Sequence, residues 1–141
     1  MSDKEKKKVL FLCTHNSARS QMAEGILRNL YGDKFEVFSA GTEPSRVNLY
    51  AIEAMQEIGI DMSAHNSKSI DKFEGMKIDY IVTVCDHAKE SCPTFPEAKH
   101  NIHKGFSDPS KFGGKDEEIL LGFKQVREEI RSWIQKEFER K

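Results

Sequence analysis

A cysteine and an arginine stand six positions apart in the run Cys13-Thr14-His15-Asn16-Ser17-Ala18-Arg19. A loop that leads into a helix N-terminus points several backbone N–H groups at one place, and the helix dipole adds positive potential there. The guanidinium of Arg19 can close such a cradle with two parallel hydrogen bonds to a tetrahedral oxyanion. The spacing therefore predicts an oxyanion site built from residues 14–18 and Arg19.

The same environment would act on the thiol of Cys13. A free thiol has a pKa of about 8.5, so only a few per cent of it is thiolate at neutral pH. A helix N-terminus and an adjacent arginine lower that pKa and make the thiolate the main form. We therefore expect Cys13 to be a nucleophile beside the bound anion. The competing interpretation is that Cys13 is simply a buried residue at the end of a strand.

Two further cysteines, Cys85 and Cys92, suggest redox chemistry. Cys85 ends the apolar run 79–85 as Cys13 ends the run 8–13, and if these runs are adjacent strands about 4.8 Å apart, Cys85 lies near Cys13. Seven helical residues span about 10.5 Å, whereas a disulfide needs Cα atoms within about 7 Å. We therefore expect residues 85–92 to be mobile and to change fold with redox state. Cys92 could instead be a core residue before the turn at Pro93.

Three cysteines and five histidines also raise the possibility of a zinc site. The spacing of Cys85 and Cys92 does not match a C-x2-C pair, and no histidine pair has a common H-x3-H spacing. We therefore expect no metal. His15 and His87 are placed to tune the thiol pKa values, or equally to be solvated loop residues.

Strand and helix patterns alternate along the chain and would position these side chains. The expected elements are a strand at 8–13, a helix ending at Gly32, a strand at 36–40, a helix at 47–58, strands at 79–85 and 100–103, and a helix at 116–138. Such alternation predicts an α/β fold with a four-stranded parallel sheet and helices on both faces. The expected order is 2-1-3-4, the flavodoxin-like arrangement, in one domain over 1–141. Ligands bind such sheets at the carboxyl ends of the central strands, where the Cys13 loop lies.

Composition narrows the class of protein further. The 22 lysines and arginines nearly balance the 23 acidic residues, so a nucleic-acid partner is not expected. No apolar run approaches the ~18 residues that cross a membrane. Met1 is followed by charged residues rather than an apolar stretch, which predicts a cytoplasmic protein. We expect a monomer, because no apolar stripe is left once the core is assigned.

At the level of motifs, residues 13–25 resemble the active-site segment of the thioredoxin-coupled arsenate reductases. These enzymes share the fold of the low-molecular-weight protein tyrosine phosphatases. The resemblance continues through Ser39-Ala40-Gly41, Gly59-Ile60-Asp61-Met62-Ser63, Val82-Thr83-Val84-Cys85, Cys92-Pro93 and Gly105-Phe106-Ser107-Asp108-Pro109. It therefore covers nearly the whole chain.

The resemblance implies a role for each residue of the loop. Cys13 would attack the arsenic of arsenate, Arg19 and the loop amides would hold the oxyanion, and Ser20 would hydrogen-bond the thiolate. Asp108 lies where the family has its general acid.

The resemblance also implies a relay between the cysteines. Cys85 would attack the adduct on Cys13, which releases arsenite and forms a Cys13–Cys85 disulfide. Cys92 would then attack Cys85 and leave a Cys85–Cys92 disulfide for thioredoxin. This thiol exchange needs no metal and no organic cofactor.

Some members of that family bind potassium near the loop. Asn16, Glu24 and Ser39 match three of their ligands, but Asn66 and Lys68 stand where a threonine and an aspartate would complete the set. We therefore expect Lys68 to supply the positive charge and no potassium site to form.

Two other functions remain open. The first is a phosphomonoesterase of the tyrosine-phosphatase type that uses Cys13, Arg19 and Asp108 and has no need of Cys85 and Cys92. The second is a non-catalytic oxyanion sensor or phosphocarrier module with Cys13 as the attachment point.

Overall fold

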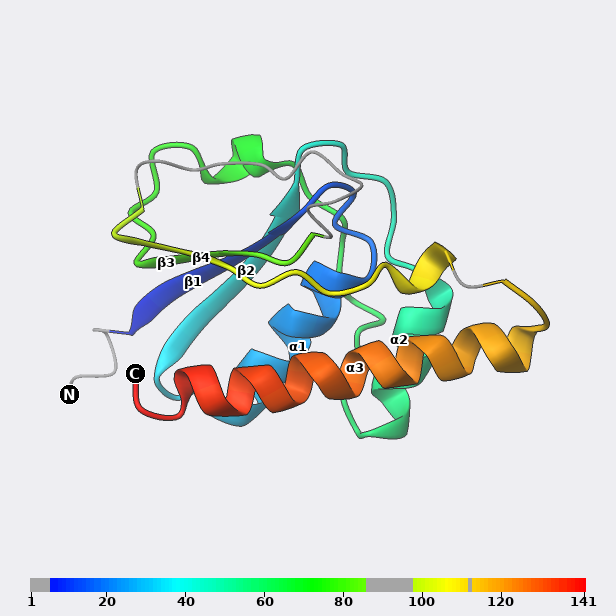
Figure 1. The fold of residues 1–141 in the computed structure, drawn as a ribbon. Helices are drawn as coiled ribbons and strands as arrows, with labels where there is room; N and C mark the ends of the chain where they lie inside the picture. Colours follow the sequence, from blue (N-terminus) through cyan, green and yellow to red (C-terminus); the bar gives the residue numbers. More distant parts are fainter. Residues whose placement is uncertain (1–5, 86–97, 112) are drawn as a thin grey trace.

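The computed structural model describes residues 6–85, 98–111 and 113–141, and its strands form one parallel sheet (Figure 1). The strands are β1 (Lys7–Cys13), β2 (Phe35–Gly41), β3 (Tyr80–Thr83) and β4 (His100–His103). All three strand pairs are parallel and the order is β2-β1-β3-β4. The structure therefore confirms the α/β fold and the order 2-1-3-4.

The three α-helices pack against one face of the sheet (Figure 1). They are α1 (Arg19–Tyr31), α2 (Leu49–Glu57) and α3 (Asp116–Phe138). Val9, Phe11 and Cys13 of β1 point into this layer, because side chains alternate between the two faces of a strand. The sequence placed the start of α2 two residues too early. The side chain of Asn48 caps that helix by accepting hydrogen bonds from the N–H groups of Tyr50 and Ala51.

The opposite face of the sheet is covered by the segment around the 3-10 helix η2 (Ile70–Phe73), drawn in green in Figure 1. Leu10 and Leu12 of β1 pack there against Phe73. Apolar cover on both faces explains why β1 is a continuous apolar run. The sequence predicted helices on both faces; the structure has α-helices on one face and this 3-10 helix on the other. Ser69 starts η2 by accepting a hydrogen bond from the N–H of Asp71.

The third strand is shorter than the sequence predicted. β3 ends at Thr83, which pairs with Leu12 of β1 and with His103 of β4. Cys85 therefore lies two residues beyond the end of the strand rather than at its last position. Beyond the strand, the N–H of Val84 still donates to the carbonyl of Leu12 in β1.

Within the described ranges, no helix is both long enough and apolar enough to pass through a membrane.

Candidate active site

The loop between β1 and α1 presents its amides toward a small cavity. The carbonyls of Thr14, His15 and Ser17 accept hydrogen bonds from the N–H groups of residues 43, 45 and 48, and the carbonyl of Asn16 accepts one from the side chain of Gln21. In a planar trans peptide the N–H points opposite to the C=O. The amides of residues 15–18 are thus turned away from these partners and are in position to face an anion.

The start of α1 adds to this potential. Arg19 is the first residue of the helix, the first turn holds no acidic residue, and the N-cap residue Ala18 makes no side-chain cap. The N-terminal amides of a helix carry partial positive charge, which an anion can satisfy. The loop amides and the N-terminus of α1 therefore both add positive potential at the cavity.

The end of β2 passes so close to this loop that only glycine fits. A Cβ added to Gly41 would lie 2.5 Å from the carbonyl oxygen of Thr14 and 2.8 Å from that of Cys13. Both atoms belong to the backbone, so neither can rotate away. Gly41 thereby lets the end of β2 pack directly against the backbone of the loop.

A cavity of about 90 Å³ lies at this place. It is lined by Cys13, His15, Ser17, Ala18, Arg19, Ser45 and Asp108. The structure thus brings Cys13, Arg19 and Asp108 together, as the sequence led us to expect. The predicted site residues Thr14, Asn16 and Ser20 do not line this cavity. Ser45 lines it and was not predicted. The order of the strands places the loop after β2 beside the loop after β1, but it does not single out Ser45.

The guanidinium of Arg19 is fixed by two groups of one loop. Its Nη1 donates to the carbonyl oxygen of Phe106 at 3.1 Å, and its Nη2 lies 3.5 Å from Oδ2 of Asp108. Arg19 is only 3% exposed and Cys13 likewise 3%. The cation is therefore held at the cavity wall next to the thiol.

A buried network supports the loop from behind. Asn16 adopts a left-handed backbone conformation with φ of 50°, which asparagine tolerates better than most residues. Its Nδ2 donates to Oγ of Ser20 at 2.8 Å, and its Oδ1 accepts from Nε2 of Gln21 and from the N–H of Lys68. Gln21 in turn contacts His65 through its Oε1 at 2.9 Å from Nδ1. Asn16 is thus a structural hub, a role that sequence reasoning had not assigned to it or to Gln21.

A buried carboxylate lies in the same region. Glu24 is only 6% exposed, accepts a hydrogen bond from Ser39 and is paired with Arg28. The ammonium of Lys68 lies 3.9 Å from it. Burial lowers the pKa of Lys68 from its ordinary range, the neighbouring Arg28 acts in the same direction, and Glu24 opposes the shift.

Cys85 is fully buried behind the end of β1. Its Sγ lies 4.0 Å from the carbonyl oxygen of Leu12, the residue next to Cys13. Within the described residues, neither Cys13 nor Cys85 forms a disulfide. Cys92 and the expected redox-dependent change in residues 85–92 fall, apart from Cys85 itself, outside the described residues. In the part of the chain that is described, no three His, Cys, Asp or Glu side chains are grouped to hold a metal ion.

Comparison with known proteins places this arrangement in a family. The model of the low molecular weight phosphotyrosine protein phosphatase family matches residues 8–140. The chain is 50% identical over 125 residues to an arsenate reductase of Halalkalibacterium halodurans, covering 89% of this chain and 90% of that protein.

Two solved structures extend the comparison. An arsenate reductase in its reduced state matches with a TM-score of 0.76 and 33% identity, over 92% of this chain and 95% of the other. A thioredoxin-dependent arsenate reductase of Corynebacterium glutamicum matches with a TM-score of 0.65 and 27% identity, over 93% of this chain and 61% of the other. The chain therefore belongs to the low molecular weight phosphotyrosine protein phosphatase family, and within that family it groups with the arsenate reductases.

Proposed function

We propose that this protein reduces arsenate to arsenite through a relay of Cys13, Cys85 and Cys92. The observation that carries the proposal is the cavity in which a buried cysteine, an arginine and a carboxylate meet. The relatives named above are arsenate reductases, which favours this chemistry over other uses of the same loop.

The size and charge of the cavity favour a small inorganic oxyanion. Its volume of about 90 Å³ is far below the ~300 Å³ at which sites for organic ligands begin. The loop amides and Arg19 supply positive potential on one side. Asp108 stands within 3.5 Å of Arg19, where its protonated form would deliver a proton to a departing oxygen.

The first step is attack on arsenic. The thiolate of Cys13 forms a sulfur–arsenic bond while the bond from arsenic to one hydroxyl of arsenate breaks. That hydroxyl takes a proton from Asp108 and leaves as water. Ser20 assists by hydrogen bonding to the thiolate. Its Oγ already accepts a bond from Asn16, so its own proton is left to donate to another acceptor.

The second step transfers two electrons. The thiolate of Cys85 attacks the sulfur of Cys13, the sulfur–arsenic bond breaks, and its electron pair stays on arsenic, which leaves as arsenite. Cys92 then attacks Cys85, which frees Cys13 and leaves a Cys85–Cys92 disulfide. Because Cys85 is fully buried, this disulfide reaches an external reductant only if the chain around it moves.

We infer that the external reductant is thioredoxin. A relay that ends in a protein disulfide suits a dithiol reductant, since the second thiol of the donor resolves the mixed disulfide. The likeness to the thioredoxin-dependent enzyme of Corynebacterium glutamicum supports the same choice.

A coupled assay tests the proposal. Arsenate-dependent NADPH oxidation is measured with thioredoxin and thioredoxin reductase for the wild type, Cys13→Ser and Cys92→Ser. We expect turnover by the wild type alone. Cys92→Ser should still complete a single turnover, because Cys13 and Cys85 suffice to release one arsenite. Full activity of Cys92→Ser with thioredoxin would rule out the relay.

The family model favours a second candidate, hydrolysis of phosphomonoesters through Cys13. That reaction needs the cavity residues but neither later cysteine. If Cys92→Ser hydrolyses an aryl phosphate at the wild-type rate while the wild type does not reduce arsenate, the protein is a phosphatase. If neither activity is found but phosphate binds, it is an oxyanion sensor.

A further inference from the structure

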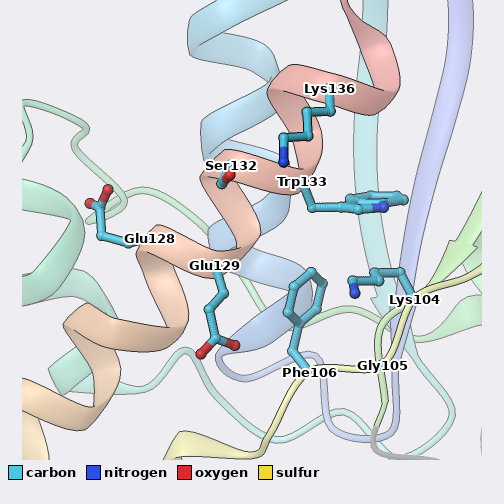
Figure 2. A pocket seen from close by; sticks show the side chains of 8 residues that line it. All are labelled: Lys104, Gly105, Phe106, Glu128, Glu129, Ser132, Trp133 and Lys136. Atoms are coloured by element: carbon cyan, nitrogen blue, oxygen red, sulfur yellow. The ribbon is translucent and has the colours of Figure 1, made fainter.

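A second, larger hollow lies on the surface where the loop after β4 crosses α3 (Figure 2). Its volume is about 560 Å³, within the range of sites that bind organic molecules. Phe106 and Trp133 form its apolar wall, with ring centroids 6.3 Å apart and an edge-to-face angle of 75°. We call it the Phe106–Trp133 hollow.

One wall of this hollow is formed by side chains of α3 that share a face of the helix. Glu129, Trp133 and Lys136 stand at positions i, i+4 and i+7 of α3, which places them on one face of the helix. Lys104 approaches from the opposite wall, and its Nζ lies 5.6 Å from the centroid of the Phe106 ring. Figure 2 shows Lys104 and Lys136 on either side of Trp133, while the carboxylates of Glu128 and Glu129 point away from it.

The charges around the hollow do not cancel. Glu128 is already paired with Arg127 at 2.9 Å and with Arg131 at 3.7 Å. Within the described residues, Lys104, Lys136 and Glu129 take part in no ion pair. Two lysines therefore stand against one glutamate, so the region near Trp133 favours an anion.

The hollow is also connected to the oxyanion cavity. Phe106 contributes its ring to the hollow and its carbonyl oxygen to Arg19, at 3.1 Å. Asp108, two residues further, lines the oxyanion cavity and lies 3.5 Å from the same guanidinium. A ligand that moves the backbone of Phe106 would therefore alter the hydrogen bonding of Arg19.

The geometry points to a regulatory site in the Phe106–Trp133 hollow that binds a planar aromatic anion and is coupled to oxyanion binding at Cys13. The aromatic part stacks against Trp133 and Phe106, and the anionic group lies between Lys104 and Lys136. By reciprocity, an oxyanion at Arg19 changes the affinity of the hollow by the same factor that the aromatic anion changes oxyanion affinity. The coupling rests on the proposed function only in requiring that the cavity binds an oxyanion.

Trp133 is the single tryptophan of the chain and lines the hollow, so its fluorescence detects binding, and the charge variants below locate it. The probe is 8-anilinonaphthalene-1-sulfonate, and N-phenyl-1-naphthylamine is its neutral counterpart. We expect the sulfonate to quench Trp133 and to bind more tightly than the neutral compound. Lys104→Glu and Lys136→Glu should each weaken sulfonate binding about fivefold, since reversal removes an attraction and adds a repulsion. They should leave the neutral compound unaffected.

The matched control is Lys77→Glu, which makes the same change of charge at an exposed lysine beside Ile78, a residue of the core on the other face of the sheet. It should bind the sulfonate like the wild type. Equal binding of the charged and neutral probes, or equal loss in Lys77→Glu, would overturn the assignment.

Phosphate tests the coupling without any arsenate chemistry. Saturating phosphate should change the affinity for the sulfonate severalfold. The change should vanish in Arg19→Lys, which cannot keep both the hydrogen bond to the carbonyl of Phe106 and the contact with Asp108. If phosphate binds but leaves the affinity for the sulfonate unchanged, the coupling is refuted. If the protein reduces no arsenate but the sulfonate still binds with this charge dependence, the proposed function fails and the hollow stands.

Discussion

The ammonium of Lys68 lies 3.9 Å from Oε1 of Glu24, a carboxylate that is almost fully buried beside the Cys13 loop. The backbone N–H of Lys68 also donates to Oδ1 of Asn16. One residue thus supplies both a charge to the carboxylate and a hydrogen bond to the loop. We propose that this protein cation takes the place of a metal cation.

Replacing Lys68 with aspartate should make the protein dependent on potassium. We expect the wild type to reduce arsenate at equal rates in potassium and choline salts of equal ionic strength. Lys68→Asp should lose about 2 kcal/mol of unfolding free energy in choline, since it leaves Glu24 near a second carboxylate, and should recover with potassium. Thermal unfolding and kcat in the two salts are the measurements. The control is Lys72→Asp at an exposed neighbour; potassium dependence in the wild type would disprove the idea.

The pH dependence of stability should report on His65. Burial lowers the pKa of its imidazole below the ordinary 6.5, with Arg28 and Lys68 acting in the same direction and Glu24 opposing. The unfolded chain therefore binds more protons at mildly acid pH. The free energy of unfolding should fall as the pH drops below 6.5 toward the folded pKa, and be fully present above 6.5.

His65→Asn removes this titration while its amide can still donate to Oε1 of Gln21, the atom that His65 contacts. Urea unfolding between pH 8 and pH 5.5 should show a flatter acid limb for this variant than for the wild type. Parallel curves for wild type and His65→Asn would show that another group is responsible.

Asp108→Asn separates proton delivery from anion binding. Loss of a general acid lowers kcat by about 10²- to 10⁴-fold. The affinity for phosphate should be kept or improved, because the carboxylate 3.5 Å from Arg19 competes with a bound anion and the amide does not. Steady-state kinetics and phosphate inhibition measure the two effects. Asp33→Asn, at an exposed site, should change neither. An unchanged kcat in Asp108→Asn would contradict a proton-donor role.

Gly41→Ala tests the close approach between β2 and the loop. The added methyl would lie 2.5 Å from the carbonyl oxygen of Thr14, so the backbone must shift. We expect a loss of about 1–3 kcal/mol in unfolding free energy, as for other overpacked sites, with weaker phosphate binding. Gly113→Ala, where nothing lies within 4 Å, should be neutral. Titration calorimetry measures the phosphate affinity of both variants. An unchanged phosphate affinity in Gly41→Ala would show that the loop does not depend on this contact.

The parts of the fold that follow from local pattern could be predicted. Apolar runs that alternate with helical stripes imply a parallel sheet, and the order 2-1-3-4 then places the Cys13 loop at its carboxyl edge. The meeting of Arg19 and Asp108 followed from the family resemblance and not from spacing, since 88 residues separate them.

Contacts between loops could not be predicted in this way. Ser45 reaches the cavity because the backbone of its loop bonds to the carbonyls of the Cys13 loop, and no periodicity encodes such a bond. Gln21 reads as an ordinary polar residue of a helix, yet it is fully buried because it bridges Asn16 and His65. The end of β3 depends on how far β4 runs beside it, which the apolar run through Cys85 does not reveal.

The two described thiols differ in their access to solvent. Cys85 is completely buried, whereas Cys13 lines the oxyanion cavity. Peroxide dissolved in the solvent meets Cys13 in its open cavity and can oxidise it to a sulfenic acid, while Cys85 offers no surface to attack. A sulfenic acid condenses with a thiol to give a disulfide and water. The sulfenic acid of Cys13 would therefore give the same Cys13–Cys85 disulfide that forms in the proposed relay. The reductant that supports arsenate reduction would then also restore the oxidised enzyme.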